Sequence, residues 1–99
     1  MIRLALTSVI AVILSVSAVG AETLDRIRDS GTIKLGYRED APPFSFKNNI
    51  GEPAGYTIAL CRAVAGQIKS QLKLDALKVD YVPVTAENRF KDVADGKID

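Results

Sequence analysis

The chain has 99 residues, of which 13 are basic and 12 acidic, giving a formal net charge of +1. This balance offers no electrostatic argument for binding nucleic acid or an acidic membrane surface. The sequence has no His and a single Cys, which excludes His-based acid–base chemistry, His metal ligands, CxxC redox pairs and an intrachain disulfide. We therefore expect no metal and no cofactor.

An apolar segment opens the chain. Arg3 is its only charge, and 4–19 is almost wholly apolar before the small residues that end at Ala21. This pattern predicts a secretory signal peptide over residues 1–21, cleaved after Ala21. An uncleaved anchor is disfavoured because a membrane span needs about 20 apolar residues and a positive flank. The expected mature product, 22–99, is soluble, formally neutral and periplasmic.

A short helix and a strand are expected next. Thr23 is a suitable N-cap for a helix that Gly31 ends. Residues 32–37 then alternate between apolar and polar side chains, which predicts a strand with Ile33 and Leu35 on one face.

A loop follows the expected strand. The strand delivers the polar residues 38–40 to its carboxyl end, and the prolines at 42–43 stiffen the chain around Phe44. The residues at 48–55 are typical of a turn, which is expected to join 45–46 to a returning segment.

Residues 56–72 have a helical period, with Thr57 as a possible cap. Leu60 and Val64 are expected to widen the apolar face. Cys61 lies near the middle of this face, where a small buried thiol is the ordinary outcome and a disulfide to another part of the protein the minority one.

A second strand and a third helix complete the pattern. Residues 78–84 are strand-like, and Thr85 is expected to cap a helix that Gly96 ends. The apolar side chains of this helix that share a face are Phe90, Val93 and Ala94. Residues 97–99 are typical of a strand's beginning. Helices that alternate with strands predict an α/β fold with a mostly parallel sheet, and two or three strands barely form its core, so we expect the N-terminal part of a larger protein.

The order and spacing of several motifs resemble the periplasmic solute-binding proteins of ABC importers, and more narrowly the glutamate/aspartate-binding branch. The segments that carry the resemblance are Thr23-Leu24-Asp25-Arg26-Ile27, Gly36-Tyr37-Arg38-Glu39, Pro43-Phe44-Ser45-Phe46, Gly55-Tyr56, Val84-Thr85-Ala86-Glu87-Asn88-Arg89-Phe90 and Gly96-Lys97-Ile98-Asp99. The likeness covers essentially all of 22–99. It implies a partial first lobe of a two-lobed periplasmic-binding-protein fold (type II), which closes around its ligand.

Candidate ligand contacts lie beyond the carboxyl ends of the expected strands, where open α/β sheets bind ligands. Arg38 and Arg89 follow two such ends, and a guanidinium holds a carboxylate bidentately while staying charged. In the family, arginines at these two places contact the ligand. Thr85 and Phe44 are further candidates. For Phe44 the alternative is that the ring packs in the core and does not contact the ligand.

Simpler interpretations stay open. Arg38 is expected to be either a ligand contact or a solvated charge, and Arg89 either a ligand contact or a partner of a nearby acid. Glu39 and Asp40 point to opposite faces and do not form a catalytic carboxylate pair. They are expected to be solvated, or one of them to neutralise Arg38. Ala86 replaces a hydroxyl residue common in the branch, which leaves the exact ligand open.

The resemblance implies a non-enzymatic, monomeric binding protein that delivers an acidic or polar amino acid to an inner-membrane ABC permease. It implies no nucleic-acid partner. Residues that grip the α-carboxylate in the family follow the strand that begins at Ile98. The alternatives are a cyclohexadienyl dehydratase-like enzyme on the same scaffold, a sensory input domain of a receptor or kinase, and a truncated reading frame without function.

Overall fold

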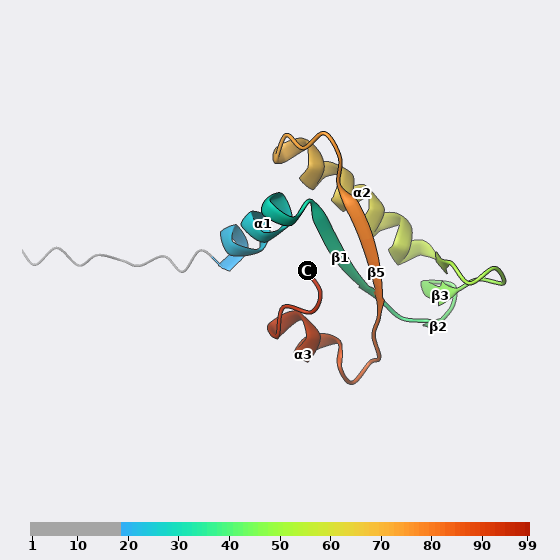
Figure 1. Ribbon diagram of the computed structural model, residues 1–99. Helices are drawn as coiled ribbons and strands as arrows, with labels where there is room; N and C mark the ends of the chain where they lie inside the picture. The colour runs from blue at the N-terminus through green and yellow to red at the C-terminus, as the bar shows by residue number, and fades with distance from the viewer. Residues whose placement is uncertain (1–18) are drawn as a thin grey trace, which may run out of the picture.

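The computed structural model describes residues 19–99 (Figure 1). Its elements are α1 (Val19–Ser30), β1 (Thr32–Tyr37), β2 (Asp40–Ala41), β3 (Ser45–Lys47), β4 (Pro53–Ala54), α2 (Tyr56–Gln71), β5 (Lys78–Pro83) and α3 (Arg89–Ala94). Helices alternate with strands, which confirms the predicted α/β class. Residues 1–18 of the predicted signal peptide lie outside the described residues, so cleavage after Ala21 stays a prediction.

Two small sheets organise the chain. β1 and β5 pair in parallel, with Ile33 opposite Val79, and lie side by side in Figure 1. β2, β3 and β4 form an antiparallel sheet in which Phe46 lies opposite Ala54. A segment does return to pair with β3, as predicted, but it is β4 at Pro53–Ala54, which lies inside the residues 48–55 that were predicted to form the turn. The parallel pair requires a long crossover, which α2 supplies.

The core lies where α1, β1 and α2 meet. Ile27, Ile33 and Ala65 form a buried cluster and are 1%, 3% and 4% exposed. The apolar side chains packed against this cluster are Leu35, Ile68, Leu72, Leu77 and Val79. Burying an isoleucine side chain contributes about 1.5–3 kcal/mol. Leu35 packs against the same cluster as Ile33, as the alternation predicted.

The predicted caps of the first two helices are wrong. α1 begins at Val19, so Thr23 lies inside the helix. The N-cap of α2 is Gly55. Thr57 lies in the first turn, and its hydroxyl donates a 2.6 Å hydrogen bond to the carbonyl oxygen of Phe44. Its side chain is therefore used to fix the preceding loop instead of the helix end.

The predicted cap of the third helix is also displaced. α3 begins at Arg89 with Asn88 as its N-cap, three residues later than a cap at Thr85 implies. The amide of Thr85 donates to Oδ1 of Asn88 at 2.8 Å, and the amide of Asn88 donates to Oγ1 of Thr85 at 3.1 Å. These reciprocal bonds close a turn before the helix. The predicted end is confirmed, because Gly96 follows the C-cap with φ +72°.

Four side chains expected to be buried on helix faces are exposed. Leu60 and Val64 of α2 are 48% and 55% exposed, and Phe90 and Val93 of α3 are 73% and 54% exposed. The expectation of burial is wrong for residues 19–99, because no described element packs on these faces. Cys61, expected to be buried, is half-buried and a free thiol.

The last residues follow the edge of β1 that β5 leaves free. Ile98 is 6% exposed and packs over Gly36, where a Cβ atom would lie 2.6 Å from its Cδ1. The amide of Asp99 donates to the carbonyl oxygen of Lys34 at 2.8 Å. Residues 97–99 were predicted to begin a strand. They form no strand in the structure, but this bond joins them to the sheet edge as a further strand would begin.

Candidate ligand-binding site

Two arginines from distant segments line one cavity. Arg38 follows β1 and Arg89 begins α3, and both line a cavity of about 450 Å³ together with Phe44. We call it the arginine cavity. The rest of its lining is largely apolar and includes Tyr37, Ile58, Cys61, Val84, Phe90, Val93 and Ile98. Three of the four residues predicted as ligand contacts thus lie around one space.

The fourth predicted residue lies around a second space. Thr85 lines an adjacent cavity of about 340 Å³, and Arg38 belongs to both cavities. The acidic residues that line this adjacent cavity are Glu39, Asp40 and Glu87. Arg38 therefore separates an apolar space that contains a second arginine from a polar space that contains carboxylates.

The backbone that carries Arg38 is fixed from within the loop. Ser45 is 8% exposed, and its hydroxyl donates a 2.6 Å hydrogen bond to the carbonyl oxygen of Arg38. Sequence reasoning missed Ser45 as a supporting residue. No local signal marked it, because the alternation over 44–46 places the two aromatic residues on one face and the serine on the other, and apolar side chains are the ones expected to be buried.

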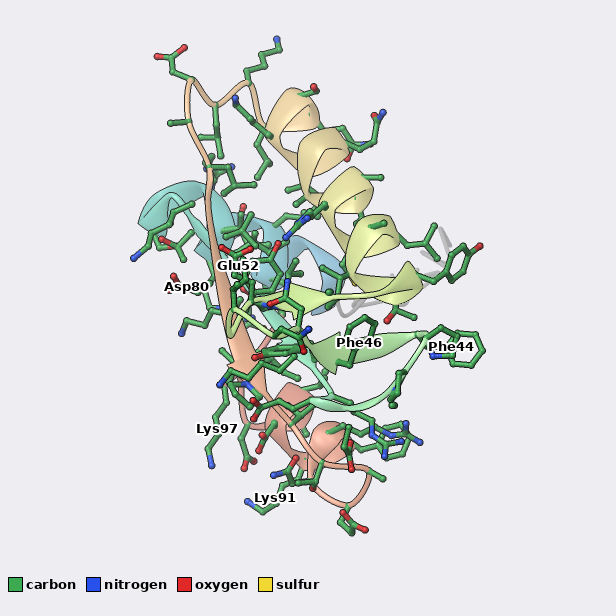
Figure 2. The ribbon with its side chains drawn as sticks, turned by 90° about the vertical axis from the view of Figure 1, so that its right-hand side faces the viewer. Phe44, Phe46, Glu52, Asp80, Lys91 and Lys97 are labelled. Carbon is green, nitrogen blue, oxygen red and sulfur yellow. The ribbon has the colours of Figure 1, made fainter. Side chains whose placement is uncertain are left out.

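The loop that carries Phe44 is pinned to the start of α2. The carbonyl oxygen of Phe44 accepts bonds from both the amide and the hydroxyl of Thr57, at 2.9 and 2.6 Å. Gly55 has φ +118°, and a Cβ atom there would collide with the carbonyl of Phe44. Phe44 is 59% exposed and projects outward beyond the end of β3, whereas Phe46 lies over the strand (Figure 2).

The guanidinium of Arg38 has an acidic partner. Nε of Arg38 donates a hydrogen bond to Oδ1 of Asp40 at 3.3 Å, and Nη2 forms an ion pair with the same oxygen at 3.2 Å. One of the two neighbouring acids therefore pairs with Arg38, as was expected. Glu39 lies 3.2 Å from Nζ of Lys47, and this hydrogen bond and the charge of Glu39 raise the pKa of Lys47 above 10.5.

Arg89 has a different environment. It is exposed, and its guanidinium carbon lies 4.8 Å from the ring centroid of Phe90. No ion pair of Arg89 occurs among residues 19–99, and Asp92, an expected partner, lies 3.9 Å from Nζ of Lys97. A cation over an aromatic face is attracted to the ring while its outer edge stays available to an anion.

Residues 19–99 contain no group of three or more side chains suited to hold a metal ion. No helix among them is both long and apolar enough to span a bilayer.

Known proteins match the chain over most of its length. The family model of bacterial extracellular solute-binding proteins, family 3, matches residues 33–99. The L-glutamate/L-aspartate-binding protein of Pseudomonas aeruginosa is 38% identical in an alignment of 97 residues that covers 94% of this chain and 32% of that protein. The glutamate/aspartate import solute-binding protein of Escherichia coli is 31% identical over 98 residues, covering 99% of this chain and 32% of that protein.

One solved structure and one enzyme are also similar to this chain. An ancestral cationic amino acid solute-binding protein superposes with a TM-score of 0.67 at 35% identity, covering 78% of this chain and 31% of that chain. The cyclohexadienyl dehydratase of P. aeruginosa is 29% identical over 76 residues, covering 77% of this chain and 26% of that protein. The chain thus spans between about a quarter and a third of the length of these four proteins.

Proposed function

The chain belongs to family 3 of the bacterial extracellular solute-binding proteins, and we propose that it supplies part of the ligand site of an amino-acid-binding protein. Its described residues form part of one lobe of the periplasmic-binding-protein fold. The proposed ligand is an acidic or other polar amino acid, with glutamate and aspartate as the first candidates.

The observation that carries this proposal is the shared cavity of Arg38 and Arg89. Each guanidinium offers several N–H donors, stays charged at physiological pH and matches the geometry of a carboxylate. Two such groups on one space favour a ligand with negative charge. We assign the side-chain carboxylate of the ligand to this pair, with Phe44 and Thr85 at the borders of the two cavities.

The sign of the charge selects among the ligands that the relatives' names suggest. Those names include both glutamate/aspartate binding and cationic amino-acid binding. Two unit charges about 4 Å apart interact by roughly 4 kcal/mol at an effective dielectric constant of 20, and the sign decides whether they attract or repel. A cationic side chain beside Arg38 and Arg89 is therefore disfavoured. Closure of the two lobes removes water and strengthens these interactions.

The proposed partners follow from the family. In the whole protein, the ligand passes to an ABC permease of the inner membrane. The predicted signal peptide at residues 1–21 would direct the protein to the periplasm, and we propose that it works there as a monomer.

An enzymatic role is less well supported. One relative is a dehydratase, but the neighbouring acids of this chain are committed to cations: Asp40 to Arg38, and Glu39 to Lys47. Neither is a free carboxylate poised for proton transfer. A sensory role would be favoured by a transmembrane segment in a longer protein.

The test uses a hybrid protein, because the chain spans about a third of its relatives. Residues 22–99 replace the matching segment of the P. aeruginosa L-glutamate/L-aspartate-binding protein, and the rest of that protein is kept. Isothermal titration calorimetry then measures binding of glutamate, aspartate, glutamine, lysine and arginine. The unmodified Pseudomonas protein is the control.

We expect the hybrid protein to bind glutamate or aspartate and to bind lysine and arginine at least tenfold more weakly. A folded hybrid that prefers lysine or arginine would contradict an anionic ligand. Conversion of a cyclohexadienyl substrate would support the enzymatic alternative.

A further inference from the structure

The two arginines of the arginine cavity differ in their contacts with acidic side chains. Nε of Arg38 donates a hydrogen bond to Oδ1 of Asp40, and Nη2 lies 3.2 Å from the same oxygen, so one edge of this guanidinium already has a carboxylate. Arg89 lies against the ring of Phe90, and no acid lies within ion-pair distance of it among residues 19–99. Arg89 thus offers its full charge to a ligand, whereas Arg38 offers a charge that is partly neutralised.

Asp40 is held beside Arg38 by the backbone. It lies in β2, opposite Phe46 of β3, and the carbonyl of Arg38 is bound by the buried hydroxyl of Ser45. The two charged residues are only two positions apart on a segment fixed at both points. The backbone therefore places the side chain of Asp40, which is 77% exposed, beside the guanidinium.

Asp40 lines the adjacent cavity, so a ligand carboxylate that approaches Arg38 from the arginine cavity interacts with this resident carboxylate across the guanidinium. Like charges at short range oppose each other, so Asp40 weakens the attraction of the site for a second carboxylate. A carboxamide carries no charge and is not repelled. The advantage of an acid over its amide is thereby reduced, although both still reach the open edge of Arg38.

We propose that Asp40 is a specificity-determining residue that broadens the site from acidic amino acids to their uncharged amides. The inference rests on the proposed amino-acid-binding function. It assigns glutamine as a second ligand beside glutamate. In this proposal, Asp40 is the reason why the dissociation constants of the two ligands differ only a little.

The neighbouring acid provides a matched control. Glu39 lines the same adjacent cavity as Asp40, but its carboxylate lies 3.2 Å from Nζ of Lys47. The substitutions Asp40→Asn and Glu39→Gln each remove one negative charge and keep the shape of the side chain. Only the first removes the acid that contacts Arg38.

The experiment measures the dissociation constants of glutamate and glutamine for the hybrid protein, by calorimetry at one ionic strength. The quantity compared is the glutamine constant divided by the glutamate constant. We expect Asp40→Asn to raise this ratio about tenfold, equivalent to about 1.4 kcal/mol. Glu39→Gln is expected to change it less than twofold. Asp40→Ser is the second variant, in case the asparagine disturbs β2, and thermal unfolding verifies that each variant is folded.

A ratio that is unchanged or lower in the folded Asp40 variants would overturn the role of Asp40 and leave the proposed function in place. An equal rise in Glu39→Gln would also overturn it, because the effect would then come from the general charge of the cavity. If the unsubstituted hybrid protein binds neither ligand, the proposed function fails, and the role of Asp40 fails with it.

Discussion

Asp99 and Lys34 are joined by two hydrogen bonds across the free edge of β1. The amide of Asp99 donates to the carbonyl oxygen of Lys34 at 2.8 Å, and the amide of Lys34 donates to Oδ2 of Asp99 at 2.9 Å. Oδ1 of Asp99 also accepts a 2.7 Å bond from Arg26 of α1. One residue therefore ties the end of the chain to both the sheet and the first helix.

The first prediction concerns this tie. The side chain of Asp99 is 8% exposed, and Asp99→Asn removes its charge from beside Arg26. We expect a loss of about 1–2 kcal/mol in the free energy of unfolding, since hydrogen bonds to charged groups are stronger than neutral ones. Urea unfolding of the hybrid protein measures the loss. Asp95→Asn is the control, because its exposed pair with Lys91 contributes about 0.3–0.5 kcal/mol. Equal losses in both variants would contradict the special role of Asp99.

The second prediction concerns the loop beneath the arginine cavity. Gly55→Ala places a Cβ atom against the carbonyl of Phe44 at a positive φ, so we expect it to destabilise the protein by more than about 1 kcal/mol. Gly66→Ala is the matched control. Gly66 lies inside α2 with no atom within 4 Å of its added Cβ, and alanine there should stabilise by about 0.5–1 kcal/mol.

Urea unfolding measures the change in the free energy of unfolding, which should be negative for Gly55→Ala and positive for Gly66→Ala. A neutral or stabilising Gly55→Ala would mean that the loop is not pinned to α2 as the structure describes.

The third prediction is a pKa. The hydrogen bond and charge of Glu39 raise the pKa of Lys47 above 10.5. The pair therefore contributes stability below pH 10.5, and the contribution is lost as the pH rises through the pKa of Lys47 in the folded state. NMR titration of the side chain of Lys47 should show this raised pKa, and Glu39→Gln should lower it. An identical pKa in both proteins would show that the pair does not form in solution.

The fourth prediction concerns the chain by itself. We expect the 99-residue chain alone to lack micromolar affinity for glutamate, because it spans 32% of the length of its Pseudomonas relative. The family resemblance implies that the residues that bind the α-carboxylate of the ligand follow the segment at 97–99. Calorimetry on the isolated chain gives the answer, and a micromolar dissociation constant would refute this expectation.

Periodicity was enough to predict the strands that carry the site. The alternation over 32–37 predicted β1 with its bounds, because a half-buried strand must alternate. It also placed Arg38 at the carboxyl end of that strand. The parallel pairing of β1 and β5 followed from the helix between them, which a parallel connection requires.

The first residues of the helices were not predictable from local preferences. Thr57 and Thr85 are good caps by residue type, yet each uses its hydroxyl for a tertiary or turn contact. Such contacts depend on residues that fold against them, which a local pattern does not contain. The same limit applies to Ser45, whose partner is seven residues away.

Apolar periodicity also overestimated burial. Leu60 and Phe90 follow a helical period but are exposed in the described residues. A period identifies the face of a helix that prefers burial, whereas actual burial requires a second surface to cover it.

The most direct test of the central claim is a double-mutant cycle between Arg38 and Arg89. The dissociation constant of glutamate is measured for the hybrid protein with Arg38→Met, Arg89→Met and both changes. If the two guanidinium groups hold one ligand carboxylate, the losses in binding free energy are coupled by about 1 kcal/mol or more. Losses that add within about 0.5 kcal/mol would contradict the claim, because they would show that the two arginines act independently.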